Sequence, residues 1–366
     1  MPVVPGPVFP ETLYFSITVD GTSFPYATAG FLRAGVNKAR NFTCSFFSKE
    51  ALEMCSIGSI VEVSFGRGNL SNLIDDKKFI GVIKDLEPNE QGSFIAYDFT
   101  TYLATSQFVY YKPQDYIGQD LYFAAANACN YKGIDVSRLT QGSGIFITED
   151  MDLFGWKTRK EFVDACFNEM KVLVNDDRHP TNTIRQWQYV IRSGKVMDFF
   201  ITDEDNTITQ PSIVLSLDNE NIINENIISS LDSTRLINTI TVVSSSDETV
   251  YIQLEDKGSQ YRYGVRSFFL QYPSLDKNIL EEVGYKILNK SKYPTTSYSV
   301  SITNVDNLDL GDLIEIDMPA LSKNTVKPII EYEIELSEMM AMRCKVGIPE
   351  LSIKDYIDIL KKPTDR

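Results

Sequence analysis

Residues with the types and spacing that catalysis requires are scarce in this sequence. The single histidine, His179, follows two aspartates and an arginine and precedes Pro180, a turn-like setting that favours an exposed loop residue over a general base or metal ligand. The segment GRGN at 66–69 lacks the Lys-Ser/Thr pair of a phosphate-binding loop, and neither GxSxG nor HExxH occurs. We therefore expect no catalytic, cofactor-binding or metal-binding residues and no enzymatic activity.

Carboxylates are the abundant chemical group. The acidic clusters at 149–150 and 203–205 offer the residue types of a glycosidase. Such clusters are usually solvated turns, and an acid and base pair needs two environments that push the two pKa values apart, which the sequence does not show. A carbohydrate-active enzyme is an alternative that rests only on these acids and on Tyr110, Tyr111 and Trp187.

Three further carboxylates follow a strand pattern. Glu331, Glu333 and Glu335 alternate with apolar residues, which places all three on one face of a strand. Glu315 occupies an equivalent outward-facing position in the preceding predicted strand. In isolation this pattern indicates a solvated strand face.

The elements that carry these residues are mostly short strands. Alternating apolar residues predict a first set of strands at 14–19, 41–47, 58–66, 79–86 and 93–99, with a short helix at 49–55. This density of strands is typical of a small barrel or sandwich. Later strands are predicted at 236–243, 297–303, 312–318 and 328–336, and a last amphipathic helix at 352–361.

Helical patterns dominate the middle of the chain. Asp115 is expected to cap a helix that ends near Gly133. The segment TRKEFVDACFNEM at 158–170 begins with a capping box formed by Thr158 and Glu161. A third helix is predicted after Asp276, and a hairpin at 187–201.

Composition narrows the class of protein. The 366 residues carry a formal net charge of −15, which argues against a nucleic-acid-binding surface because such a surface needs cations to neutralise phosphates. The five cysteines are odd in number and show no CxxC spacing, so we expect buried apolar groups. The sequence shows neither a membrane-length apolar window nor a signal peptide. We therefore expect assembly in a cytoplasm and no stable insertion into a membrane.

The chain also contains an internal repeat. LYFSITVDG at 13–21 resembles LINTITVVS at 236–244, and GSIVEV at 58–63 resembles GDLIEI at 311–316. GSIVEV and GDLIEI are each followed by an apolar return strand, at 79–87 and 328–336 respectively. Three matches in the same order predict a duplicated β-domain.

The same ordered segments resemble the central hub proteins of contractile phage tail baseplates and related contractile injection systems. The segments that carry the resemblance are AYDFTTYL at 96–103, Gly133-Ile134, TRKEFVDACF at 158–167, LINTITV at 236–242 and LGDLIEI at 310–316. The resemblance implies a homotrimeric, pseudo-sixfold ring that joins the hexameric tail tube to the trimeric central spike. It implies contacts with the tail tube, central spike, tape measure and baseplate wedge proteins, with DNA only as passing cargo, and a place in the virion tail. The acidic connector and short C-terminal tail depart from the simplest pattern, and no cell-wall hydrolase is fused.

This resemblance sets the expected architecture, which is α+β, mainly β, with two similar tube-like β-barrel domains and an α/β block between them. The expected divisions are an extended arm at 1–11, a first tube-like domain at 12–105, an α/β domain at 106–215, a connector at 216–232, a second tube-like domain at 233–346 and a tail at 347–366.

The resemblance also gives roles to the singled-out residues. Glu315, Glu331, Glu333 and Glu335 become candidates for lining a channel whose negative field repels DNA. The aromatic residues expected at subunit or domain contacts are Tyr110, Tyr111, Tyr116 and Tyr122. The alternative is a receptor-binding or adhesive tail component, which would account for the β-content but not for the repeat.

Overall fold

The computed structural model describes two compact units. The described residues are 13–67, 77–89, 91–138, 142–176, 179–192, 195–203, 213–216, 228–232, 236–293, 295–302, 308–318, 323–336, 341–347 and 349. Unit 1 comprises Met1–Asn226, Val300–Pro349 and Arg366, and unit 2 comprises Ile227–Ser299 and Glu350–Asp365. The expected arm at 1–11 and the expected helix at 352–361 lie outside the described residues.

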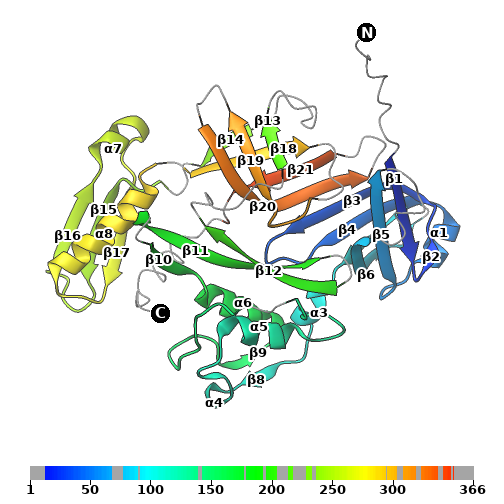
Figure 1. The fold of residues 1–366 in the computed structure, drawn as a ribbon, viewed down its shortest axis with the longest axis horizontal. Helices are drawn as coiled ribbons and strands as arrows, with labels where there is room; N and C mark the ends of the chain where they lie inside the picture. The colour runs from blue at the N-terminus through cyan, green and yellow to red at the C-terminus, as the bar shows by residue number, and fades with distance from the viewer. Residues whose placement is uncertain are drawn as a thin grey trace, which may run out of the picture. The chain divides into compact units, whose positions relative to one another are not determined.

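Unit 1 is built on a large curled sheet (Figure 1). Its N-terminal strands are β1 (Leu13–Val19), β2 (Thr22–Ser23), β3 (Ala27–Gly35), β4 (Asn41–Phe47), β5 (Ile60–Arg67), β6 (Lys77–Glu87) and β7 (Gln91–Tyr97). They pair antiparallel in the order β3-β4-β7-β6-β5-β1-β2. The short helix α1 (Lys49–Met54) follows β4 as predicted, because the Ser48 side chain accepts a hydrogen bond from the Ala51 N–H.

Alternation along these strands places large apolar side chains on one face. Leu32, Phe42, Phe79 and Phe94 are almost completely buried there. The Phe42 and Phe94 rings lie 6.2 Å apart, a normal distance for packed aromatic rings. On β4 the alternate positions carry Thr43 and Ser45, whereas Ile80 and Ile95 occupy alternate positions on β6 and β7.

The C-terminal strands of unit 1 extend the same sheet. They are β19 (Leu313–Met318), β20 (Lys323–Leu336) and β21 (Ala341–Val346), and β13 (Ile213–Ser216) pairs in parallel with β19. β20 pairs antiparallel with β3, with Glu333 opposite Arg33. Strands from the two ends of the chain therefore share one continuous hydrogen-bonded sheet.

The strand order repeats within this sheet. β5, β6 and β7 form two successive hairpins, and β7 lies beside β4. β19, β20 and β21 likewise form two successive hairpins, and β21 lies beside β18 (Thr295–Ile302). The match between 58–63 and 311–316 thus falls on equivalent strands with antiparallel return strands.

One part of the predicted repeat is wrong. β1, which contains LYFSITV, pairs with β5 in unit 1. The segment LINTITVVS instead ends in β15 (Thr239–Ser244), which lies in a separate three-stranded sheet of unit 2. An alternating strand sequence specifies one buried face but not which neighbouring strands it pairs with.

The α/β block of unit 1 surrounds a second apolar core. Its elements are α3 (Thr100–Ala104), β8 (Val109–Tyr111), α4 (Pro113–Tyr116), α5 (Leu121–Cys129), β9 (Gly155–Lys157), α6 (Arg159–Glu169), β10 (Val172–Asp176), β11 (His179–Arg192) and β12 (Val196–Asp203). The predicted capping box at Thr158 and Glu161 is present, and β11 and β12 form the predicted hairpin.

The single helix expected after Asp115 is two helices. Asp115 lies inside α4, and Gly118, with φ +82°, interrupts the helical path. Asp120 instead caps α5 by accepting a hydrogen bond from the Tyr122 N–H. The predicted cap at Asp115 is therefore wrong, and the longer helix begins after Asp120.

Unit 2 contains a three-stranded sheet with helices. Its elements are β14 (Ile228–Asp232), which pairs with β18, and then β15, β16 (Tyr251–Glu255), α7 (Lys257–Tyr263), β17 (Ser267–Tyr272) and α8 (Lys277–Ser291). β15 is central, antiparallel to β16 and parallel to β17. α8 is capped by Asp276 as predicted and packs on β15 and β16.

Candidate functional site

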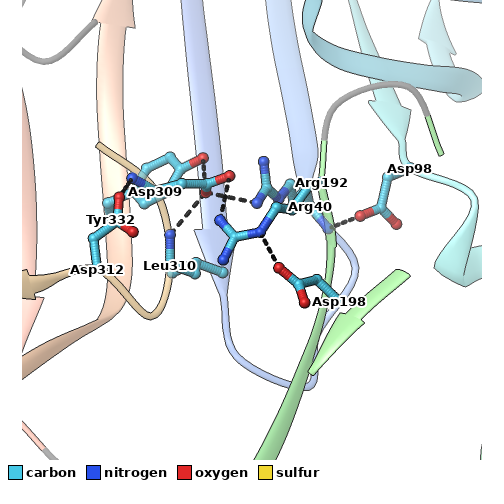
Figure 2. A network of polar contacts seen from close by, with 8 residues as sticks. All are labelled: Arg40, Asp98, Arg192, Asp198, Asp309, Leu310, Asp312 and Tyr332. Carbon is cyan, nitrogen blue, oxygen red and sulfur yellow. Dashed lines mark hydrogen bonds and ion pairs between the residues drawn. The ribbon is translucent and has the colours of Figure 1, made fainter. Parts of the chain in front are cut away.

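A buried cluster of charged residues joins three distant parts of unit 1 (Figure 2). We call this set the Arg40 cluster, and its members are Arg40, Asp98, Arg192, Asp198, Asp309, Asp312 and Tyr332. Arg40 ends the turn between β3 and β4, Arg192 and Asp198 lie on the β11–β12 hairpin, and Asp309 precedes β19. The cluster therefore connects the N-terminal sheet, the α/β block and the C-terminal strands.

Asp309 is the centre of this cluster. Its Oδ1 accepts a hydrogen bond from the Arg40 guanidinium at 2.6 Å and one from the Tyr332 hydroxyl at 3.2 Å. Its Oδ2 lies 3.3 Å from Arg192 Nη1, and the Nε of Arg192 donates to Asp198 at 2.6 Å. One carboxylate thus bridges two guanidinium groups that come from different segments.

The turn after β3 is held by backbone groups as well. Asp98 accepts from the Arg40 N–H at 2.9 Å and from the Thr100 N–H at 3.0 Å. The Arg40 carbonyl in turn accepts from the Asp98 N–H at 3.0 Å. This reciprocal pair fixes the start of β4 against the residues that follow β7.

Burial and charge shift the pKa values in this cluster. The Arg40 side chain is 3% exposed; burial alone would lower its pKa, but Tyr332 and Asp309 raise it. Burial would raise the pKa of Asp309, yet Arg40 and Arg192 hold it below the usual range. The pKa of Asp98 is raised to about 6 because burial outweighs its hydrogen bonds.

A second polar contact ties the same turn to the α/β block. The Asn37 side chain donates to Gln188 at 2.6 Å and accepts from the Tyr189 N–H at 2.8 Å. The Asn37 N–H donates to the Tyr189 carbonyl at 3.1 Å. Asn37 has φ +58°, a left-handed conformation that asparagine tolerates well. The turn is thus fixed on two sides by buried hydrogen bonds.

This arrangement suits a structural role. Arg40 and Arg192 are paired with the Asp309 and Asp198 carboxylates, whereas the Asp98 and Asp312 carboxylates accept hydrogen bonds from backbone N–H groups (Figure 2). Breaking such a pair leaves an uncompensated buried charge, which opposes movement between the segments. In the described part of the chain, no group of three His, Cys, Asp or Glu side chains could hold a metal ion.

The structure brings the three predicted carboxylates of β20 together and places cations beside two of them, Glu331 and Glu333, while Glu335 lies opposite Phe31 and Ala341. Glu331, Glu333 and Glu335 lie on the solvent-facing side of β20. Glu333 forms an ion pair with Arg33 and lies opposite Arg343 of β21.

Glu331 lies opposite Lys345 and 3.5 Å from the Lys38 ammonium. We call this cross-strand set of Glu and Arg or Lys residues the charge ladder. Glu315 is half-buried on β19, opposite Val326.

The four predicted aromatic contacts separate into two groups. Tyr111 is buried and stacks on Phe162 with ring centroids 3.9 Å apart, and burial raises its pKa to about 12. Tyr116 packs against the same two rings, and Tyr122 is buried against Phe199. These three tyrosines belong to the core of the α/β block.

Tyr110 points to the other side of β8. It is 49% exposed and lies opposite Trp156 of β9, which is 69% exposed. Phe108, 61% exposed, precedes the same strand. We call these three residues the β8–β9 aromatic patch.

The remaining sequence expectations concern His179 and the cysteines. His179 is the first residue of β11, opposite Asp176, so its backbone belongs to a strand and not to the predicted loop. All five cysteines are buried and free, as predicted. In the described residues no helix has the length and apolar character needed to cross a membrane.

The Arg40 cluster escapes prediction from sequence. Arg40 ends the segment GVNKAR, whose composition is typical of an exposed turn. Arg192 and Asp309 lie 152 and 269 positions further along the chain, and no local pattern links them to Arg40. The only local signal is the Asp309–Asp312 pair, in which Asp312 accepts from the Asp309 N–H.

Comparison with known proteins places this fold among phage tail proteins. No protein-family model and no curated protein sequence matches the chain. Two solved structures share the fold along most of their length, with a TM-score of 0.58 and 12% sequence identity in each case.

One is the tail protein from Neisseria meningitidis MC58, in which 92% of this chain matches 97% of that chain. The other is the 43 kDa tail protein of prophage MuSo2 from Shewanella oneidensis, in which 92% of this chain matches 96% of that chain. The resemblance to tail proteins is thus confirmed for the fold, as is its mainly-β character.

Proposed function

We propose that this chain is a structural component of a phage-type tail baseplate, and specifically its central hub. The observation that carries the proposal is the shared fold with two tail proteins over 92% of this chain. In the proposed role, three copies form a pseudo-sixfold ring between the hexameric tail tube and the trimeric central spike. The ring leaves a channel for DNA or the tape measure protein, and wedge proteins bind around it.

The repeated strand order supports this role. β5-β6-β7 and β19-β20-β21 are equivalent double hairpins in one sheet. If each belongs to one tube-like domain, a trimer presents six similar units to a hexameric tube. The division into two separate barrels and the domain boundaries given from sequence belong to this proposal.

The charge ladder modifies the proposed channel lining. Glu331, Glu333 and Glu335 would by themselves create a negative wall, but Arg33, Lys38, Arg343 and Lys345 lie beside or opposite them. A wall of alternating charges is hydrophilic and nearly neutral. In the proposed channel this stripe would keep water at the wall, and DNA repulsion would depend on the chain's overall net charge of −15.

Solution mass and imaging test the proposal. A trimer has a mass of about 124 kDa, three times the 41.4 kDa of one chain. We expect light scattering to give this mass, alone or with the spike protein from the same gene cluster, and electron microscopy to show rings. A chain that stays monomeric with both the spike and the tube proteins would refute the hub role.

An adhesive tail component is the second candidate, and the β8–β9 aromatic patch favours it. Exposed Tyr and Trp rings are common in recognition surfaces because they bury large areas at low entropic cost. Binding of the intact chain to host-surface glycans, abolished by Trp156→Ser, would support adhesion. If the chain assembles into rings but does not bind glycans, the adhesive role is refuted and the hub role stands.

A further inference from the structure

Unit 2 contains a stretch of chain between Asp256 and Asp276 that carries cations but no acidic side chain. The 19 residues Lys257–Leu275 contain three cations and no Asp or Glu, whereas the full chain has 50 acidic residues among 366. If acidic residues were spread evenly along the chain, a segment of 19 residues would contain about 2.6 of them. This segment comprises α7 and β17, and Figure 1 shows α7 at one end of the three-stranded sheet.

The exposed side chains of this segment include aromatic, aliphatic and basic ones. We call six of them the basic-aromatic surface, namely Lys257, Tyr261, Arg262, Val265, Arg266 and Phe269; Ser267, Gln271, Pro273 and Leu275 of the same segment are also exposed. Tyr261 is 95% exposed, Val265 66% and Phe269 59%. Tyr and Arg side chains contribute most of the binding energy in many protein interfaces.

Buried polar groups hold the backbone beneath this surface. Asn238, fully buried, accepts from the Arg266 N–H at 2.8 Å and donates to the Gly264 carbonyl at 2.7 Å. Gly264 has φ +74°, a conformation that side chains other than glycine rarely adopt. Ser259, also fully buried, donates to the Lys292 carbonyl. A backbone held in this way presents its exposed side chains in a fixed arrangement, which lowers the entropy lost on binding.

β17, which follows α7 in the chain, is an edge strand of the described three-stranded sheet. In the described structure it pairs only with β15. Its sequence, SFFLQY, contains no charged residue or proline. Isolated proteins usually protect such edges with charges, prolines or covering elements. An uncharged edge beside an exposed Phe269 is typical of a strand that is covered in the assembled state.

We infer that the basic-aromatic surface is a contact between copies of this chain, with a carboxylate-bearing surface of a second copy as its occupant. Charge complementarity carries the choice, because a chain of net charge −15 offers acidic surfaces to a local group of three cations. Lys257 is partly offset by Glu255 at 3.6 Å, which leaves Arg262 and Arg266 as the principal cations of the contact. This inference rests on the proposed function, because the contact and the proposed trimer both require copies of the chain to associate.

Sedimentation velocity of the intact chain over a concentration series tests the contact. The main variant is R262E/R266E, and Tyr261→Ser is the second variant because its side chain is almost fully exposed and cannot disturb folding. The control, K132E/R138E, makes the same charge change on exposed residues of unit 1. Circular dichroism and thermal unfolding of each variant confirm that it is folded.

We expect the wild type and the control to associate, and R262E/R266E to weaken association by roughly 10- to 100-fold. Tyr261→Ser should weaken it by roughly 10-fold, and added salt should weaken the wild type. If both surface variants associate as the wild type does, this contact is refuted while the trimer stands. If the wild type forms dimers that the variants abolish, the contact stands and the trimer fails. A wild type that stays monomeric refutes this contact, whereas the trimer is refuted only if the chain also stays monomeric with the spike and tube proteins.

Discussion

Replacing Arg40 by methionine should destabilise unit 1 substantially. The change removes the cation 2.6 Å from Asp309 at a site that is 3% exposed, and methionine fills a similar volume. Removing one partner of a buried ion pair costs about 3–5 kcal/mol. Because Arg192 stays 3.3 Å from Asp309, we expect the lower end, about 3 kcal/mol.

Thermal unfolding measures this effect. For a unit of this size, a loss of about 3 kcal/mol lowers Tm by roughly 6–12 °C. Arg33→Met is the matched control, since Arg33 pairs with Glu333 but its side chain is 51% exposed. An exposed pair contributes about 0–1 kcal/mol, so its Tm should fall by less than about 4 °C.

The pH dependence gives a second readout of the same substitution. Arg40 lowers the pKa of Asp309, so it contributes stability above the ordinary carboxyl pKa that is lost as the pH falls through the lowered value. The difference between wild type and Arg40→Met should therefore shrink below about pH 4. Equal Tm values for Arg40→Met and Arg33→Met at pH 7 would refute a structural role for the cluster.

Three further predictions follow from buried groups. The pKa of Asp98 is raised to about 6, so the free energy of unfolding of unit 1 should fall by about 3 kcal/mol as the pH rises from 4 to 7. Asp98→Asn should remove this pH dependence, measured by urea unfolding at each pH, while lowering overall stability. Tyr111→Ala should cost about 3–5 kcal/mol and Tyr110→Ala less than about 1, because only Tyr111 is buried; similar losses would contradict this assignment. Gly81→Ala should lower Tm strongly, because its Cβ would lie 2.4 Å from a ring carbon of Phe79 and 2.6 Å from the Tyr97 carbonyl oxygen, and an unchanged Tm would contradict this close packing.

Local patterns in the sequence predicted most elements of this fold. Thr158 and Glu161 form the expected capping box, and the hairpin partners of 58–66 and 311–316 lie where the alternation indicates. These features depend on residues close in the chain. The helix cap at Asp115 was wrong because two candidate caps, Asp115 and Asp120, lie only five residues apart.

Long-range pairing could not be predicted in the same way. β3 was missed because ATAGFLRAG has small residues where a strand pattern needs large ones. Yet β3 is the strand that pairs with β20 and precedes the turn that carries Asn37 and Arg40. The charges opposite Glu333 are known only once that pairing is known, which is why a purely acidic stripe was expected.

The pairing of β3 with β20 also has a consequence during protein synthesis. Arg33 and its partner Glu333 are 300 residues apart. At about 5–20 residues per second, a ribosome needs about 15–60 s to make the intervening chain. Throughout that time the β3 edge has no β20 to pair with. Arg33, a charge on this edge, would discourage pairing with other nascent chains. Slow translation or loss of this charge should therefore lower the yield of folded chain more than its final stability suggests.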